Sequence, residues 1–345
     1  MTLRGNMRVF CRLRPGTGAD AFNAQTGTVG DLRVRAPASK TVDGRDEAAK
    51  VLHFKFDYVF PDDARQCDVF DEVQGLVQSA LDGHNVCIFA YGQTGSGKTH
   101  TMSNHTGADP GIIPRALELI LREHSQKPRL SLLEIYNEEL RDLLAPVSAD
   151  SQGKRSRNAG KRKAASSAAA PKLRIRIDPK RGKPQLQGLS EVAISSAAHA
   201  RDLLQRAEDS RMVARTNANE RSSRSHVVLT LALDHADSNT TSSIHLVDLA
   251  GSERIAHAGS DRSAKQLKEQ CSINTSLVAL KNALRALATQ QTHIPFRDSK
   301  LTYLLQDALE SQTCKTLMLC NLSQDSENIP ESLNTLRFAS QVLQN

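Results

Sequence analysis

Six consecutive apolar residues, VCIFAY at 86–91, lead directly into the glycine-rich run GQTGSGKT at 92–99. The run matches GxxxxGK[ST], a pattern typical of a loop between a buried strand and a helix. Its glycines let backbone N–H groups turn toward a phosphate, its lysine reaches the terminal phosphates, and its threonine can bind Mg²⁺. Because a chance match in a chain of this length has a probability on the order of 1%, the run predicts an α/β fold built around a phosphate loop.

The rest of the chain alternates short apolar stretches with helical patterns. We predict strands at 7–13, 86–91, 129–136, 173–177, 227–233, 244–249 and 316–320. We predict helices at 69–81, 113–123, 197–208, 265–288, 299–308 and 330–342. This order favours a P-loop NTPase fold, with a central, mostly parallel mixed sheet and helices on both faces. No strong compositional break divides residues 1–345, so we expect a single domain.

Composition sets limits on the class of protein. Hydrophobic residues make up 39% of the 345 residues, enough for a sizeable core. The longest strongly apolar run has six residues, against the roughly 20 that a membrane-spanning helix needs. The first 15 residues lack the apolar centre of a signal peptide, and the six cysteines include no CxxC pair. We therefore expect a cytoplasmic protein in a reducing compartment, with no membrane partner.

The net charge of +7 is concentrated in one place. Residues 153–163 hold six basic and no acidic side chains, so the rest of the chain carries only +1. From 145 to 172 the only large aliphatic residue is Val147. Because such a segment cannot bury enough apolar surface to offset its ordering entropy, we predict a disordered basic insertion at 145–172 on the surface of the domain.

Two further stretches carry candidate chemistry. The apolar run IHLVDLAG at 244–251 delivers Asp248 at the end of a predicted strand and places Gly251 three residues later. An aspartate after a strand can equally be a helix cap or turn residue, but with a phosphate loop in the chain it is expected to bind Mg²⁺, through a water. The polar run NANERSSRSH at 217–226 offers hydroxyls beside a glutamate and an arginine. Taken alone, it is most simply a solvated loop.

Three motifs together resemble a known family. GQTGSGKTHTM, NERSSRSH and DLAGSER, in this order and spacing, resemble the phosphate loop and the two switches of the kinesin motor domain. Further similar stretches are VFCRLRP, LLEIYNEELRDLL, INTSL, HIPFRDSKLTYLLQDAL and NTLRFAS. The resemblance covers essentially the whole chain apart from the basic insertion. It implies an ATP hydrolase that uses Mg²⁺ and is stimulated by microtubules.

The resemblance also implies residue roles. The expected ATP-binding residues are Arg12, Arg14, Pro15, Gly92, Gln93, Thr94, Gly95, Ser96, Gly97, Lys98, Thr99 and His100. Arg12, Arg14 and Pro15 would form the adenine-side wall, with His100 stacked on the base. The expected Mg²⁺ ligands are Thr99, Ser223 and Asp248, and the expected catalytic residues are Ser222, Arg224, Gly251 and Glu253. Ser222 and Glu253 would organise the attacking water, and Arg224 and Glu253 would form an ion pair that closes the two switches after ATP binds.

The expected microtubule contacts lie after the second switch. They are Lys265, Lys268, Lys281, Arg285, His293, Arg297 and Lys300, together with the basic insertion. A charged helix face is usually only solvated, and the family resemblance is what turns these cations into expected contacts with the acidic tubulin surface. Thr275 stands where the family often has a lysine, so one contact would be missing. No nucleic-acid partner is expected.

Residues 3–10 resemble the neck-to-motor junction of the C-terminal-motor kinesins, which step toward microtubule minus ends. We therefore expect minus-end movement, a monomer for this chain by itself, a homodimer with an upstream coiled coil, and location on cytoplasmic microtubules, the spindle included. The alternatives are a plus-end-directed motor and a non-motile microtubule-binding P-loop protein. A Ras-like GTPase would need an NKxD or TKxD guanine-reading motif, and neither occurs in the sequence.

Overall fold

The computed structural model describes residues 7–18, 21–25, 30–40, 46–104, 108–145, 173–179, 182–215, 224–253, 264–310 and 313–343. The predicted basic insertion lies outside these residues from position 146 onward, and the hydroxyl-rich part of the 217–226 run lies outside them up to position 223. In the described part of the chain, no helix combines the length and apolar character needed to cross a membrane.

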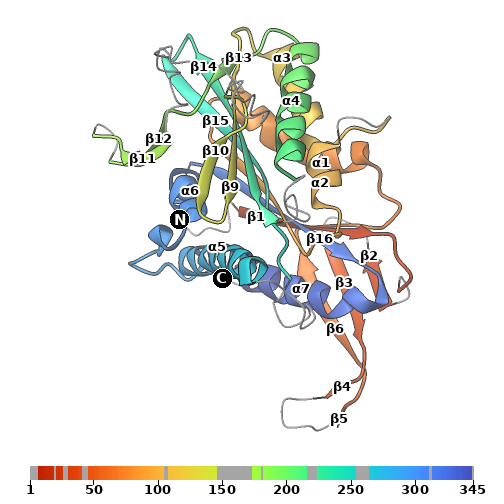
Figure 1. The fold of residues 1–345 in the computed structure, drawn as a ribbon. Helices are drawn as coiled ribbons and strands as arrows, with labels where there is room; N and C mark the ends of the chain where they lie inside the picture. The colour runs from red at the N-terminus through yellow and green to blue at the C-terminus, as the bar shows by residue number, and fades with distance from the viewer. Residues whose placement is uncertain are drawn as a thin grey trace, which may run out of the picture.

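A mixed sheet forms the centre of the molecule (Figure 1). Its strands are, in spatial order, β10 (Glu139–Asp142), β9 (Arg129–Tyr136), β14 (His226–His235), β15 (Thr240–Asp248), β8 (Val86–Tyr91), β16 (Lys315–Ser323), β1 (Met7–Arg14) and β7 (Tyr58–Phe60), and β13 (Val192–Ala193) also pairs with β9. The strands from β15 through β8, β16 and β1 to β7 are parallel. The strands from β10 through β9 and β14 to β15 are antiparallel. The carboxyl ends of the parallel strands therefore meet at one edge, where ligands bind in open α/β sheets.

Helices cover both faces of the sheet, as predicted (Figure 1). One core contains residues of α1 (Gln66–Leu81), α2 (Lys98–Ser103), α3 (Ile112–Glu123) and α4 (Ala197–Arg215). The other contains residues of α5 (Ala264–Ala288), α6 (Lys300–Glu310) and α7 (Ile329–Leu343). Each predicted strand and helix corresponds to one of the observed elements.

The burial of both faces of strand β8 explains why its sequence is apolar throughout. Cys87, Phe89 and Tyr91 point into the core beneath α5–α7, and the alternate residues, such as Ile88, point into the core beneath α1–α4. A strand buried on both faces reads as a continuous apolar run rather than as an alternation. The phosphate loop thus starts from one of the most deeply buried strands of the protein.

A second sheet was not predicted. Strands β2 (Phe22–Gln25), β3 (Gly30–Ala36) and β6 (Lys50–Phe56) form an antiparallel sheet whose apolar side packs with α7. Two hairpins, β4–β5 (Ser39–Lys40 and Asp46–Glu47) and β11–β12 (Arg174–Ile177 and Pro184–Gln187), and the short 3₁₀ helices η6 (Phe296–Asp298) and η7 (Ser326–Asn328) complete the described elements. Only one face of β3 is buried, so its apolar signal is short and alternates with charges.

Candidate functional site

A cavity of about 660 Å³ opens at the carboxyl ends of β1 and β8. Five segments far apart in the sequence line it: the end of β1, the stretch between β7 and α1, the phosphate loop with the start of α2, the residue after β15, and β16. Its lining residues are Arg12, Leu13, Arg14, Pro15, Asp62, Ala64, residues 94–101, Leu249 and Asn321. The predicted base-side wall and phosphate loop therefore face one cavity.

The phosphate loop depends on glycine at two positions. Gly92 has a φ of +152°, and a Cβ there would lie 2.2 Å from the carbonyl oxygen of Asn321 on β16. Gly97 caps α2 in the left-handed conformation, with a φ of +96°. A residue with a side chain would be unfavourable in both arrangements, so the loop geometry requires glycine at these two positions of the motif.

Lys98 is buried, at 7% exposure, at the beginning of α2. Its Nζ donates a hydrogen bond to the carbonyl oxygen of Gln93, at 2.8 Å. Burial lowers the pKa of Lys98, and the charges of Asp248 and Glu253 oppose that shift. The cavity thus holds a cation that an anionic phosphate would stabilise better than the present neutral partner does.

Thr99, which lines the cavity, contacts Asp248 directly although the two residues lie 149 positions apart. The Thr99 hydroxyl donates to Oδ2 of Asp248 at 2.6 Å, whereas the buried Oδ1 has no hydrogen-bond partner among the described residues. Burial raises the pKa of Asp248, opposed by the charge of Lys98 and the Thr99 hydrogen bond. An unpartnered carboxylate oxygen beside a hydroxyl fits Mg²⁺, which prefers oxygen ligands and keeps several waters. Ser223, the third predicted ligand, lies outside the described residues.

Glu253 contacts the phosphate loop directly. Its two carboxylate oxygens accept from the backbone N–H of Thr94 at 2.8 Å and from the Thr94 hydroxyl at 2.7 Å. A Cβ at Gly251 would lie 2.3 Å from both Glu253 Oε2 and the Thr94 hydroxyl, so glycine is required for this approach. The Arg224–Glu253 ion pair stays a prediction, and Ser222 lies outside the described residues.

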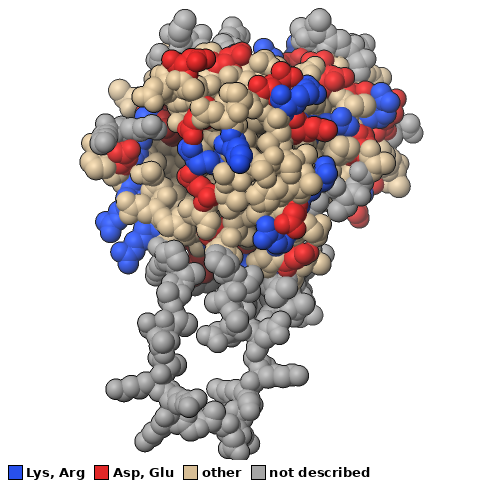
Figure 2. Space-filling view, turned by 90° about the horizontal axis from the view of Figure 1, so that it is seen from above, with Lys and Arg blue, Asp and Glu red and all other residues tan. Residues whose placement is uncertain are grey.

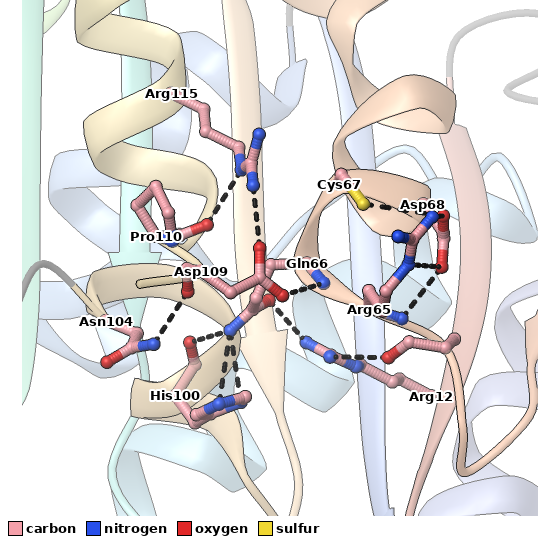
Figure 3. A network of polar contacts seen from close by, with 11 residues as sticks. Arg12, Arg65, Gln66, Cys67, Asp68, His100, Asn104, Asp109, Pro110 and Arg115 are labelled. Atoms are coloured by element: carbon pink, nitrogen blue, oxygen red, sulfur yellow. Dashed lines mark hydrogen bonds and ion pairs between the residues drawn. The ribbon is translucent and has the colours of Figure 1, made fainter. Parts of the chain in front are cut away.

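On the base side, Arg12 is buried, although its position in a strand would also allow it to face solvent. Arg12 is 8% exposed and donates to Gln66 Oε1 at 2.7 Å (Figure 3). It also donates to the Thr101 hydroxyl at 2.9 Å and to the Ala64 carbonyl at 3.1 Å. Arg14 donates to the carbonyl oxygen of Gly95. The two arginines therefore brace the cavity wall, and their predicted contact with a base stays a prediction.

His226 ends the NERSSRSH motif, and the motif by itself predicts no role for it. It is buried, its Nδ1 accepts from the backbone N–H of Ala250 at 3.1 Å, and its Nε2 lies 2.8 Å from the hydroxyl of Ser276 on α5. The Ser276 hydroxyl in turn donates to the carbonyl of Ile273. Burial first, and the charge of Lys98 second, lower the pKa of His226 to about 3. A neutral histidine thus ties the end of β15 to α5, and only its buried position in a folded chain reveals this.

The cations predicted to contact microtubules differ in their exposure and in the groups that they contact. Arg285, His293 and Arg297 are exposed. The Lys281 Nζ lies 5.0 Å from the ring centroid of Phe338 and 5.6 Å from that of Tyr91, and Lys300 binds the backbone carbonyl of Glu138. Lys265 and Lys268 belong to α5, but their side chains are outside the description. On the face seen in Figure 2, acidic and basic side chains of the described residues are interspersed.

Residues 12–344 match the family model of the kinesin motor domain. The chain is 41% identical to kinesin-like protein KIN-14D of Arabidopsis thaliana, over 99% of the chain and 44% of that relative. It is 40% identical to kinesin-like protein 2 of Schizosaccharomyces pombe, over 99% of the chain and 41% of that relative. The chain therefore spans less than half the length of these two relatives.

Solved structures give the same result. The motor domain of the Saccharomyces cerevisiae kinesin-like protein Kar3 is 36% identical, with a TM-score of 0.75 over 98% of this chain and 99% of that one. The C-terminal motor and motor homology domain of Kar3Vik1, fused to a synthetic heterodimeric coiled coil, is 37% identical, with a TM-score of 0.77 over 99% of this chain and 86% of that one.

Proposed function

The chain belongs to the kinesin motor domain family, and from that premise we propose that it hydrolyses ATP, is stimulated by microtubules and converts the turnover into movement along them. The observation that carries the proposal is that two carboxylates from the end of β15 and the residues after it contact the phosphate loop, which lines the cavity. Asp248 accepts from Thr99, and Glu253 accepts from Thr94, close in sequence to Lys98. These residues come from two segments: the phosphate loop, and the end of β15 with the residues that follow it. The two segments must act together on a terminal phosphate.

Hydrolysis at such a site needs positioning and charge stabilisation rather than a covalent enzyme intermediate. Lys98 would bind the β- and γ-phosphates, and Thr99, Asp248 and Ser223 would hold Mg²⁺, which supplies charge neutralisation on the phosphate oxygens. Glu253 and Ser222 would orient the attacking water, and Gly251 would let the backbone approach the γ-phosphate. For this, Glu253 must leave Thr94, and Arg224 would then become its partner.

The connection to the filament would run through α5. His226 joins the backbone N–H of Ala250 to Ser276 on that helix, so a shift of the residues after β15 would reach the middle of α5. Arg285 on α5, and His293 and Arg297 after it, are exposed and suited to an acidic tubulin surface. We place the working chain on the microtubules of the cytoplasm, including the spindle.

Minus-end direction and dimerisation are part of the proposal. Support comes from the similarity to KIN-14D and to the C-terminal motor of Kar3Vik1. The proposed homodimer would form through a coiled coil upstream of residue 1. A gliding assay on polarity-marked microtubules, with a dimeric coiled coil fused before Met1, is expected to show the minus end trailing; a leading minus end would identify the plus-end alternative.

The decisive experiment for the function is phosphate release by the purified chain with and without polymerised tubulin. We expect ATP turnover to rise on the order of tenfold or more with microtubules. Turnover that does not change on adding microtubules would refute the motor proposal. Binding to microtubules without any ATP turnover would instead identify the non-motile alternative.

The basic insertion offers a separate prediction about filament affinity. Deleting residues 153–163 removes six positive charges, so we expect the dissociation constant for microtubules to rise at low salt more than at high salt. Co-sedimentation at two ionic strengths measures this. Replacing the segment by a Gly/Ser linker of equal length controls for loop length. An unchanged constant at low salt would exclude a tether role.

A further inference from the structure

A lysine occupies a position on the inner side of α5. Leu277 and Leu284, one turn before and one turn after Lys281, are 3% and 1% exposed. Val278 and Arg285, on another face of the same helix, are exposed. Residues three or four positions apart lie on one face of a helix, so Lys281 belongs to the stripe that packs toward the core, and its side chain is half-buried.

The ammonium of this lysine lies over two aromatic rings. Lys281 Nζ is 5.0 Å from the ring centroid of Phe338 on α7 and 5.6 Å from that of Tyr91 on β8. The two rings pack against each other, with their centroids 5.1 Å apart. A cation within about 6 Å of a ring face is attracted to it, and more strongly where water is excluded. Both rings are buried, so one side chain joins α5 to a strand and to a second helix.

Tyr91 connects this contact to the phosphate loop. It is the last residue of β8 and directly precedes Gly92. Burial raises the pKa of Tyr91, and a hydrogen bond with the side chain of Ser252 opposes that shift. The backbone N–H of Ser252 donates to the carbonyl oxygen of Gly92 at 3.1 Å. The rings beneath Lys281 therefore reach the point where the start of the phosphate loop meets the residues after β15.

The space beside the contact allows α5 and α7 to move against each other. Both helices cover the same face of the sheet (Figure 1). A cleft of about 310 Å³ opens between them, and both Lys281 and Phe338 line it. Because the two helices are not fully packed together at the cleft, a contact that crosses it has a larger influence on their relative position than one within a filled core.

The position of Lys281 also separates it from the neighbouring cation on its helix. Arg285 lies one turn farther along α5 and is exposed, as a contact with an acidic filament requires. For Lys281 to make the same contact, its ammonium would have to leave both rings. The two residues carry the same charge on the same helix, and their surroundings give them different roles.

We propose that Lys281 is a positioning residue that couples α5 to the start of the phosphate loop: its ammonium holds Tyr91 and Phe338, so that a change at either the nucleotide or the filament side is transmitted to the other. This inference rests on the proposed motor function and deepens it. Lys281 is not among the residues that line the nucleotide cavity. Its loss therefore affects the response to microtubules rather than ATP affinity.

Three variants test the inference. Lys281→Met removes the charge and keeps a long apolar side chain, and Lys281→Arg restores a cation that can lie over the rings. Arg285→Met, which removes the same charge from the exposed side of α5, is the matched control. ATP turnover over a range of microtubule concentrations, at low and at high salt, gives the maximal stimulation and the concentration for half-maximal stimulation. Thermal unfolding reports folding.

For Lys281→Met we expect the maximal microtubule-stimulated turnover to fall on the order of fivefold, the factor that one partly buried cation–ring contact supplies. Basal turnover, KM for ATP and the salt dependence of half-maximal stimulation should stay within about twofold of the wild type, and Lys281→Arg should recover most of the loss. For Arg285→Met we expect the opposite pattern, with half-maximal stimulation shifted to higher microtubule concentration at low salt more than at high salt.

Two further measurements address the coupling itself. In a Phe338→Leu background one of the rings is absent, so Lys281→Met is expected to reduce stimulation less than it does in the wild type. Hydrogen exchange of the α5 amides at 277–285, with and without Mg²⁺–ADP, needs neither a filament nor turnover. We expect nucleotide to change this exchange in the wild type and in Lys281→Arg, and several-fold less in Lys281→Met.

Unchanged stimulation in Lys281→Met, a loss that matches the salt-dependent pattern of Arg285→Met, or a Lys281→Arg as impaired as Lys281→Met would each overturn the inference. If Phe338→Leu does not fold, the comparison of Lys281→Met with Lys281→Arg decides. A wild type that microtubules do not stimulate refutes the proposed function instead. The exchange experiment then still judges the inference, because a nucleotide effect on α5 that is absent from the wild type, or equal in the wild type and Lys281→Met, contradicts it.

Discussion

The two sides of the cavity are held together by different kinds of contact. On the base side, Arg12, Gln66 and Thr101 form a buried network in which a cation is bound by neutral acceptors. On the phosphate side, the contacts join charged groups to neutral partners: Lys98 to a loop carbonyl, Glu253 to Thr94, and Asp248 to Thr99. One oxygen of Asp248 has no hydrogen-bond partner within the part of the chain that the structure describes.

This difference suggests that the base side keeps its contacts when a nucleotide binds, whereas the phosphate side exchanges them. Each phosphate-side group has a partner that a Mg²⁺–nucleotide would replace with a better one, because opposite charges stabilise buried charges more than neutral dipoles do. On the base side, the Arg12 guanidinium already has three neutral acceptors. We therefore expect changes on the phosphate side to affect turnover, and changes on the base side to affect affinity.

The largest expected effect comes from Glu253→Ala. Removing the carboxylate should leave nucleotide binding within a few-fold of the wild type while kcat falls by roughly 10²–10³-fold, the typical cost of losing one group that organises the transition state. Single-turnover phosphate release and equilibrium binding of a fluorescent nucleotide measure the two quantities. Near-normal turnover would show that Glu253 only braces Thr94.

A smaller effect is expected from His226→Gln, which tests whether the phosphate side extends to α5. The folded pKa of about 3 lies far below the ordinary value of 6.5, so this neutral histidine stabilises the fold above pH 6.5, and the stabilisation is lost as the pH falls toward 3. The variant should be less stable by about 1–2 kcal/mol at pH 7, with the difference shrinking toward pH 4.

Chemical denaturation at several pH values gives this difference. Another buried histidine, His245, has a pKa lowered to about 4, and because it titrates in both proteins its contribution cancels. We also expect weaker microtubule stimulation at unchanged basal turnover. A stability difference that stays constant from pH 7 to pH 4 would contradict the neutral, buried role.

The smallest expected effect has the opposite sign. Burial raises the folded pKa of Asp248 above its ordinary value of 3.8, so stability present at low pH is lost as the pH rises through that raised pKa. Asp248→Asn cannot ionise and should stabilise the protein without Mg²⁺ or nucleotide by about 1 kcal/mol at pH 7. Thermal unfolding in EDTA measures the gain.

The same variant should lose the extra stabilisation that Mg²⁺–ATP gives the wild type. Thr302→Val controls for the loss of a buried polar group, because Thr302 lies on α6 and is not among the residues that line the cavity. This variant should be destabilised under both conditions. Destabilisation of Asp248→Asn without Mg²⁺ would mean that the carboxylate is well satisfied in the free protein.

Much of this fold follows from local sequence. The apolar runs predicted β1, β8, β15 and β16, and the helical patterns predicted the large helices, because each signal lies within about ten to twenty consecutive residues. The three-stranded sheet formed by β2, β3 and β6 escaped prediction. Its strands are short and one-sided, and their burial against α7 depends on residues about 300 positions away.

The sequence by itself determined the phosphate loop, because the residues that turn the backbone, from Gly92 to Thr99, are contiguous and their φ angles are local properties. Only the tertiary structure decided which side chains share a hydrogen bond. The pairs Thr99–Asp248, Arg12–Gln66 and His226–Ser276 are separated by 149, 54 and 50 positions. Their meeting depends on strand order and helix packing, which bring distant polar groups into a low-dielectric interior where each must find a partner.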